Sequence, residues 1–157
     1  MPGPFLIGQF NDSFKPIMDG VALCAENYTR WLDLKYGTAH AVVPHVPRFH
    51  DDDSFIVLRY PSLPIPLMPP YRIGLPWASP MVDRFLTLTR FDLVHSHTPF
   101  VAGRMAMRTS RRHGIPHVST FHTKYRDDVL RVARSERFAD IVIKRIDVGV
   151  ITIVIVF

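Results

Sequence analysis

Three histidines, His95, His97 and His122, each follow a short apolar run that is typical of a buried β-strand. A neutral imidazole can donate or accept a hydrogen bond or bind a metal ion, so histidines that gather at one edge of a sheet suggest catalysis or ligand binding. His95 and His97 are two positions apart and would share one face of a strand, as two metal ligands can, but no third ligand follows nearby in the sequence. We therefore expect no metal, and expect both side chains to fix loops through hydrogen bonds.

The elements that must position these histidines form a strand–helix–strand unit. Residues 91–94 and 117–121 have the pattern of strands, and the apolar positions of residues 101–112 recur at helical spacing. Gly114 and Pro116 end the helix. Two strands joined through a helix pair in parallel by a right-handed crossover, and parallel sheets bind ligands beyond the carboxyl ends of their strands. The three histidines are therefore predicted to meet at the carboxyl edge of one sheet.

The rest of the chain predicts an α/β domain on the same plan. The further strands are expected at residues 5–10, 39–43 and 55–60, and the further helices at residues 20–34, 79–90 and 127–144. Gly20 opens the first helix, after a polar loop, and Gly37 closes it. The proline-rich segment 61–76 is unsuited to a helix or a central strand and is expected to pack over the domain. The apolar tail 147–157 is either a buried strand or sequence foreign to the domain.

Composition limits the classes of protein to consider. The chain has 157 residues, 47% of them hydrophobic, which fits one folded domain, and its net charge of +5 suits a nucleotide, a phospholipid surface or a nucleic acid. The only cysteine, Cys24, excludes an internal disulfide, is expected to be a small buried hydrophobe and points to a reducing, cytoplasmic setting. No signal peptide is visible, and the tail is shorter than the roughly 20 residues of a membrane-spanning helix.

Asp51 and Asp53 form a D-x-D pattern that could hold a divalent metal with a nucleotide diphosphate. Three acidic residues in a row within a turn are more often simply solvated, and we favour that interpretation. The loop before Gly20 has neither the GxGxxG nor the GxxxxGK pattern of the common phosphate-binding loops. A glycine at a helix amino terminus still allows a phosphate to approach the backbone.

Three segments together resemble a known family: the loop 11–20, the run HSHTPF at residues 95–100 and the run FHTKYRDD at residues 121–128. The chain resembles the acceptor-side, amino-terminal domain of retaining GT-B glycosyltransferases of the family 4 type, and is most similar to diacylglycerol glucosyltransferases and phosphatidylinositol mannosyltransferases. The resemblance implies a Rossmann-like parallel sheet flanked by helices, half of a GT-B fold, over residues 1–146. It implies transfer of a hexose from a UDP- or GDP-sugar to an acceptor hydroxyl, with retention and without a metal cofactor.

The resemblance also implies roles for individual residues. Gly20 matches the second glycine of a loop that faces the donor phosphates, whereas Asp19 replaces the first. His122 matches the histidine beside the transferred sugar, where it would stabilise the transition state by hydrogen bonding to a sugar hydroxyl. Asp12 would orient or deprotonate the acceptor hydroxyl. The predicted contacts to a lipid or carbohydrate acceptor are His97, Tyr125 and Arg126.

Four arginines of the predicted helix 101–112 form a basic face. They are Arg104, Arg108, Arg111 and Arg112. Such a face is often only solvated, but a lipid-modifying enzyme must reach a membrane, and each basic residue near anionic lipid contributes about 1 kcal/mol. We therefore expect this face to touch an anionic membrane surface, with the protein cytoplasmic and peripheral at the inner face of the cell membrane.

The family binds the sugar nucleotide mainly through a second, carboxyl-terminal Rossmann domain, which this sequence does not contain. We therefore expect no transferase activity from the chain alone. Three alternatives stay open: a non-catalytic binding or interaction module, a metal-dependent transferase that uses Asp51 and Asp53, and a nucleic-acid binder, which we disfavour because no recognition motif accompanies the basic residues.

Overall fold

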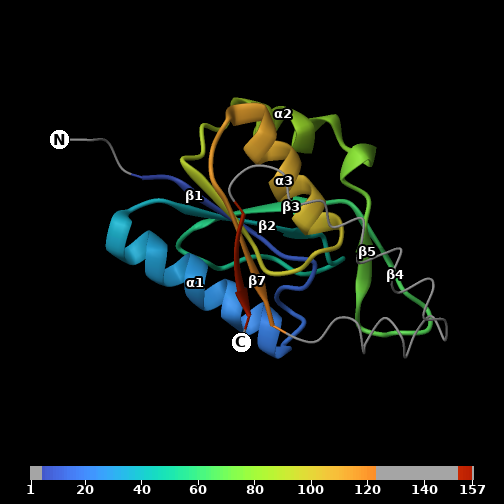
Figure 1. Cartoon of the computed structure of the whole chain (residues 1–157). Coiled ribbons are helices and arrows are strands. Elements are labelled where there is room, and N and C mark those ends of the chain that lie inside the picture. The colour runs from blue at the N-terminus through green and yellow to red at the C-terminus, as the bar shows by residue number, and fades with distance from the viewer. Residues whose placement is uncertain (1–4, 123–151, 157) are drawn as a thin grey trace.

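The computed structural model describes residues 5–122 and 152–156, and a six-stranded parallel sheet forms its centre (Figure 1). The strands lie in the order β3-β2-β1-β6-β7-β8, and each neighbouring pair is parallel. They are β1 (Ile7–Phe10), β2 (Ala39–Pro44), β3 (Ile56–Tyr60), β6 (Leu93–Ser96), β7 (His117–Phe121) and β8 (Thr152–Val156). From β1 the chain adds β2 and β3 on one side of the sheet and then β6, β7 and β8 on the other, so the topological switch point lies between β1 and β6. Rossmann-like sheets bind their ligands at such a point. The predicted fold class is confirmed.

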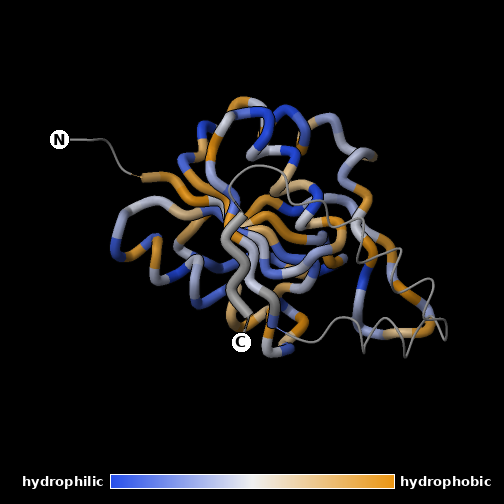
Figure 2. Tube along the Cα trace, viewed as in Figure 1, coloured by the Kyte–Doolittle hydropathy of each residue, from blue (hydrophilic) through white to orange (hydrophobic). Residues whose placement is uncertain are grey.

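Helices cover both faces of the sheet (Figure 1). Helix α1 (Gly20–Tyr36) lies on one face, and α2 (Pro80–Leu88) and α3 (Val101–His113) lie on the other. A core cluster that includes Phe10, Val94 and Met105 fills the space beneath α2 and α3, while Phe14 and Val43 belong to a smaller cluster beneath α1. Figure 2 shows the hydrophobic residues concentrated on the central strands. Each fully buried side chain of this size stabilises the fold by about 1.5–3 kcal/mol.

The helix ends are set by the residues that the sequence singled out. Asp19 caps α1, since its carboxylate accepts a hydrogen bond from Ala22 N at 2.7 Å. Gly37 and Gly114 end α1 and α3 in the left-handed conformation, with φ of 82° and 65°. Gly103 allows α3 to lie close to the loop after β6, because a Cβ at this position would lie 2.4 Å from Thr98 O.

The proline-rich segment packs over the domain, as predicted, but it does so as an antiparallel hairpin that the sequence did not predict. Strands β4 (Ser62–Pro64) and β5 (Arg72–Gly74) pair with each other and lead to a short 3-10 helix, η1 (Pro76–Ala78). Gly74 lies against Tyr60, so close that an added Cβ would be 2.4 Å from the ring. A two-stranded hairpin has only edge strands, which tolerate proline, and this is why the prolines did not exclude it.

Residues 152–156 of the apolar tail form β8, which extends the sheet beside β7. These residues are thus a strand, and both interpretations of the tail, as part of the domain or as foreign sequence, stay predictions. The predicted helix at residues 127–144 lies outside the described residues. Within residues 5–122 and 152–156, no helix combines the length and the apolar character needed to cross a bilayer.

Candidate active site

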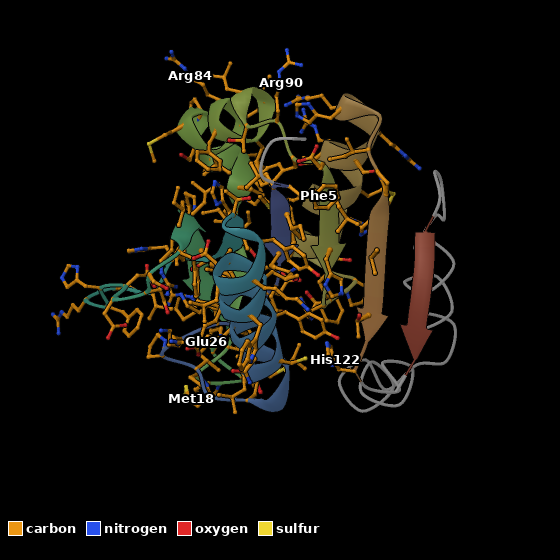
Figure 3. The ribbon with its side chains drawn as sticks, turned by 90° about the vertical axis from the view of Figure 1, so that its left-hand side faces the viewer. Phe5, Met18, Glu26, Arg84, Arg90 and His122 are labelled. Atoms are coloured by element: carbon orange, nitrogen blue, oxygen red, sulfur yellow. The ribbon has the colours of Figure 1, made fainter. Side chains whose placement is uncertain are left out.

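The three histidines meet at the carboxyl edge of the sheet, as predicted. His95 lies in β6, His97 follows that strand directly, and His122 follows the neighbouring strand β7. His97 Nδ1 lies 3.0 Å from His122 Nε2, and the two rings are nearly parallel. Figure 3 shows His122 at the same end of the molecule as Met18, which precedes α1, with Arg84 and Arg90 at the opposite end. The amino terminus of α1, where Gly20 lies, and His122 therefore share one edge of the sheet.

A buried glutamine fixes the orientation of this histidine pair. Gln9 Oε1, from β1, lies 2.8 Å from His97 Nε2, and both side chains are buried. Burial lowers the pKa of His97 to about 2, so the ring is neutral near pH 7. Because the Gln9 oxygen can only accept, His97 Nε2 carries the proton and Nδ1 has the lone pair. His122 Nε2 therefore donates to His97 Nδ1.

His95 has a structural role. Its Nε2 lies 2.7 Å from Thr120 Oγ1 in β7, and burial lowers its pKa to about 4. Tyr28 of α1 contacts the His95 ring edge-on and the His97 ring at a tilt, at centroid distances of 5.3 and 5.5 Å. The hydrogen bonds expected for His95 and His97 are present, and they tie β1, β6 and β7 together at the carboxyl edge.

Asp12 lies at the same edge but directs its carboxylate into the protein. Its oxygens accept hydrogen bonds from Thr98 Oγ1 at 2.6 Å, from Ala102 N at 3.0 Å and from the Tyr60 hydroxyl at 3.3 Å. Phe100 at the amino terminus of α3 has no side-chain oxygen, so Asp12 supplies the cap from a distant part of the chain. Burial raises the pKa of the Asp12 carboxyl, and the hydrogen bonds counteract only part of that effect. These contacts give Asp12 a clear structural role, and its catalytic role stays a prediction.

Gly20 opens α1, and no atom lies within 4 Å of the position that a Cβ would take there. Asp19, in place of the family's first glycine, turns back toward its own helix and also accepts a hydrogen bond from Ser13 Oγ at 2.6 Å. Its negative charge thus already compensates the amino terminus of α1. The proposed phosphate contact at Gly20 stays a prediction.

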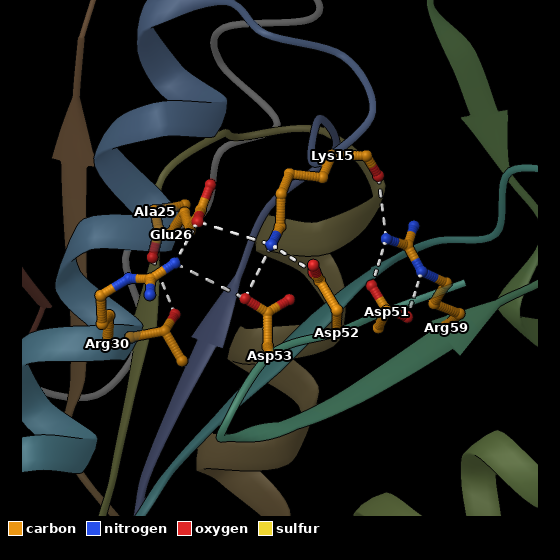
Figure 4. Close-up of polar contacts among 9 residues, drawn as sticks. Lys15, Ala25, Glu26, Arg30, Asp51, Asp52, Asp53 and Arg59 are labelled. Carbon is orange, nitrogen blue, oxygen red and sulfur yellow. Dashed lines mark hydrogen bonds and ion pairs between the residues drawn. The ribbon is translucent and has the colours of Figure 1, made fainter. Parts of the chain in front are cut away.

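The acidic run 51–53 is not simply solvated, which corrects our expectation for two of its residues (Figure 4). Asp51 forms a two-fold hydrogen-bonded ion pair with Arg59, at 2.7 and 2.8 Å. The Asp53 side chain is only 2% exposed, and Lys15 Nζ lies 2.7 Å from it. Asp52 is the most exposed of the three, with 92% of its side chain exposed, and it forms a longer ion pair with Lys15 Nζ at 3.5 Å. The sequence missed these pairs because Lys15 and Arg59 lie in other segments of the chain.

All four predicted surface arginines are exposed on α3. Arg112 and Arg108 approach Asp83 of α2 at 3.3 and 3.9 Å, so part of the positive charge is compensated. Both arginines line a shallow hollow between η1, α2 and α3 with the apolar side chains Trp77, Val82, Leu86 and Met105. This hollow does not include the histidines. Tyr125 and Arg126 lie outside the described residues.

Sequence reasoning missed two side chains of this edge. Gln9 stood in an apolar run, and a polar residue in a buried strand was the signal that could have revealed a hydrogen-bonding role. Cys24 was expected to be buried, but it is only half-buried, and its sulfur lies within 4.8 Å of ring nitrogens of His97 and His122. Helical spacing alone showed that Cys24 faces the sheet, not which residues it meets.

Comparison with known proteins gives the chain its family. It is 29% identical over 128 residues to an alpha-monoglucosyldiacylglycerol synthase of Acholeplasma laidlawii, which covers 77% of this chain and 30% of that protein. It is 28% identical over 134 residues to an alpha-monoglucosyldiacylglycerol synthase of Streptococcus pneumoniae (strain ATCC BAA-255 / R6), covering 82% of this chain and 29% of that protein. The matched region thus spans less than a third of these relatives. A sequence profile of Glycosyltransferase Family 4 matches residues 18–151, and the chain therefore belongs to Glycosyltransferase Family 4.

Proposed function

We propose that this chain is the acceptor-side half of a retaining GT-B glycosyltransferase, which moves a hexose from a sugar nucleotide to a hydroxyl of a glycolipid precursor. The observation that carries the proposal is the hydrogen-bonded series from Gln9 through His97 to His122. It ends in a half-buried imidazole at the sheet edge where the strand order reverses. The similarity to two proteins named as glucosyldiacylglycerol synthases supports a lipid acceptor.

The hydrogen bonding refines the role of His122. Burial lowers its pKa, so the ring is neutral near pH 7, and Nε2 donates to His97. Nδ1 is then the nitrogen with the lone pair, which accepts a hydrogen bond from a hydroxyl of the sugar or of the acceptor. A neutral histidine held this way orients a hydroxyl and increases the electron density on its oxygen. Asp12, which is turned inward, supports the loop between β1 and α1 in this scheme.

The basic face of α3 and its apolar neighbours fit contact with a membrane surface. Arg104 and Arg111 are exposed. Trp77, which is 74% exposed, lines the same hollow as Arg108 and Arg112. Aromatic and basic side chains together are typical of surfaces that lie in the lipid headgroup region. We propose a peripheral, cytoplasmic position at the inner face of the cell membrane, with the donor held mainly by a second Rossmann domain.

Acceptor binding by the full 157-residue chain tests this proposal. Imidazole resonances of the labelled protein would be followed by NMR during titration with diacylglycerol in detergent micelles, with empty micelles as the control. We expect the His97 and His122 signals to shift only with diacylglycerol, and the His122→Ala variant to bind more weakly while His50→Ala, altered at an exposed histidine, binds as the parent does. Identical responses to empty and diacylglycerol-loaded micelles would refute acceptor binding at this edge.

A further inference from the structure

Three potential metal ligands converge at the carboxyl edge of the sheet. The Cys24 sulfur and one ring nitrogen each of His97 and His122 all lie within 4.8 Å of one another. They come from α1, from the end of β6 and from the end of β7, so only the folded chain brings them together. We propose that Cys24, His97 and His122 bind a zinc-class metal ion. This inference goes beyond the proposed transfer reaction, for which no metal is expected.

Small shifts of the side chains would bring the three ligand atoms to the spacing of a tetrahedral site. With Zn–N distances of about 2.0–2.1 Å and a Zn–S distance of about 2.3 Å, ligand atoms at tetrahedral angles lie roughly 3.3–3.7 Å apart. His97 Nδ1 and His122 Nε2 are 3.0 Å apart in a hydrogen bond, which the ion would replace as the two nitrogens move slightly apart. Cys24 and His122 are half-buried side chains that can adjust by small rotations, whereas His97 is buried and held in place. One fixed and two adjustable ligands can therefore close on an ion.

The surroundings of His97 are those of a metal-bound histidine. Such a ring commonly donates its second N–H to an oxygen acceptor, which orients the ring and makes the ligating nitrogen more basic. Gln9 Oε1 accepts this hydrogen bond at 2.8 Å and directs the Nδ1 lone pair of His97 toward His122. Tyr28 contacts the His97 ring from α1 and limits its rotation.

Binding of the ion requires a defined movement of protons. The Cys24 thiol loses its proton and binds as the thiolate, and this proton is released to solvent. The proton that His122 holds at Nε2 leaves that nitrogen, and Nδ1 takes one up, so that His122 stays neutral. The product is a Zn²⁺ ion bound to one thiolate and two imidazoles, with the fourth position available to water. A sulfur and two nitrogens favour zinc, cobalt or copper(I) over magnesium or calcium.

Titration of the metal-free, full-length chain with ZnCl₂ by calorimetry, and with CoCl₂ by absorption spectroscopy, tests the site without any transferase assay. We expect one ion per chain, one proton released, and a sulfur-to-cobalt charge-transfer band. Since Cys24 is the only cysteine, this band reports on it alone. Failure of the diacylglycerol titration would leave this result unaffected, so the two proposals can be judged separately.

Two variants and a control decide the outcome. Cys24→Ser should abolish the band, and both Cys24→Ser and His122→Ala should weaken zinc binding by at least the roughly 10–100-fold that loss of an outer-shell partner costs. His50→Ala should bind as the parent does, and far-ultraviolet circular dichroism should show that all variants are folded. Cobalt binding without the sulfur band, or zinc affinity unchanged in Cys24→Ser and His122→Ala, would overturn the proposal.

Discussion

Replacing Asp12 with alanine should lower the free energy of unfolding by about 2–5 kcal/mol, a large effect for a residue at a candidate active site. The carboxylate accepts hydrogen bonds from Ala102 N, Thr98 Oγ1 and the Tyr60 hydroxyl. Loss of a helix cap costs about 1 kcal/mol, within a range of 0.5–2. A hydrogen bond to a charged group contributes about 1.5–3 kcal/mol, and Thr98 loses one. The Tyr60 hydroxyl adds little, because it keeps Asn11 O as an acceptor at 3.2 Å.

Urea unfolding followed by far-ultraviolet circular dichroism measures this change. Tryptophan fluorescence is less suitable, because Trp31 and Trp77 are 68% and 74% exposed and report little on the core. Asp52→Ala is the matched control, since it removes a carboxylate that is 92% exposed and forms only a 3.5 Å ion pair with Lys15, and it should change stability by less than about 1 kcal/mol. A decrease in the free energy of unfolding of less than about 1 kcal/mol in Asp12→Ala would refute the capping role and leave only the predicted catalytic role for Asp12.

The pH dependence of the same difference gives an independent check. Burial raises the pKa of Asp12 in the folded protein above the usual value of 3.8, so the folded state binds this proton more tightly than the unfolded chain does. Proton binding to Asp12 therefore stabilises the folded state fully at pH values below the pKa of the unfolded chain, and this stabilisation is lost as the pH rises through the pKa of the folded protein. The stability advantage of the parent over Asp12→Ala should accordingly increase as pH falls through that window. A decrease would show that the hydrogen bonds outweigh desolvation.

Three further predictions test other parts of the structure. Lys15→Met should destabilise the protein by about 3 kcal/mol or more, measured by urea unfolding, because it leaves the buried Asp53 carboxylate without its 2.7 Å partner. Gly103→Ala should cost about 1–3 kcal/mol through its backbone clash, whereas Gly20→Ala, which meets no atom, should change thermal stability by less than about 1 kcal/mol. In the parent, the free energy of unfolding should fall by about 1.4 kcal/mol per pH unit below pH 6.5 on account of His97, because its pKa is about 2 in the folded protein and only the unfolded chain gains the proton. His97→Gln should abolish this part of the pH dependence, measured by urea unfolding at several pH values. An unchanged slope would contradict the burial of His97 as a neutral ring.

Much of the fold could be predicted from local sequence patterns. The strand–helix–strand unit around His97, the opening of α1 at Gly20 and the glycine stops at Gly37 and Gly114 all occur as expected. These features depend on residues close together in the chain, namely on apolar spacing and on the backbone freedom of glycine. The hairpin of β4 and β5 was missed because prolines mask the strand pattern at an edge.

The residue pattern was enough to place the histidines at one edge of the sheet, because parallel strands bring their carboxyl ends to one side. The contacts of each polar group at that edge became visible in the folded chain. Folding turned Asp12 inward to cap α3, paired Asp53 with Lys15, and brought Cys24 to His97. Such contacts join residues that are distant in the chain, and their partners depend on how helices pack on the sheet, which hydrophobic periodicity does not specify.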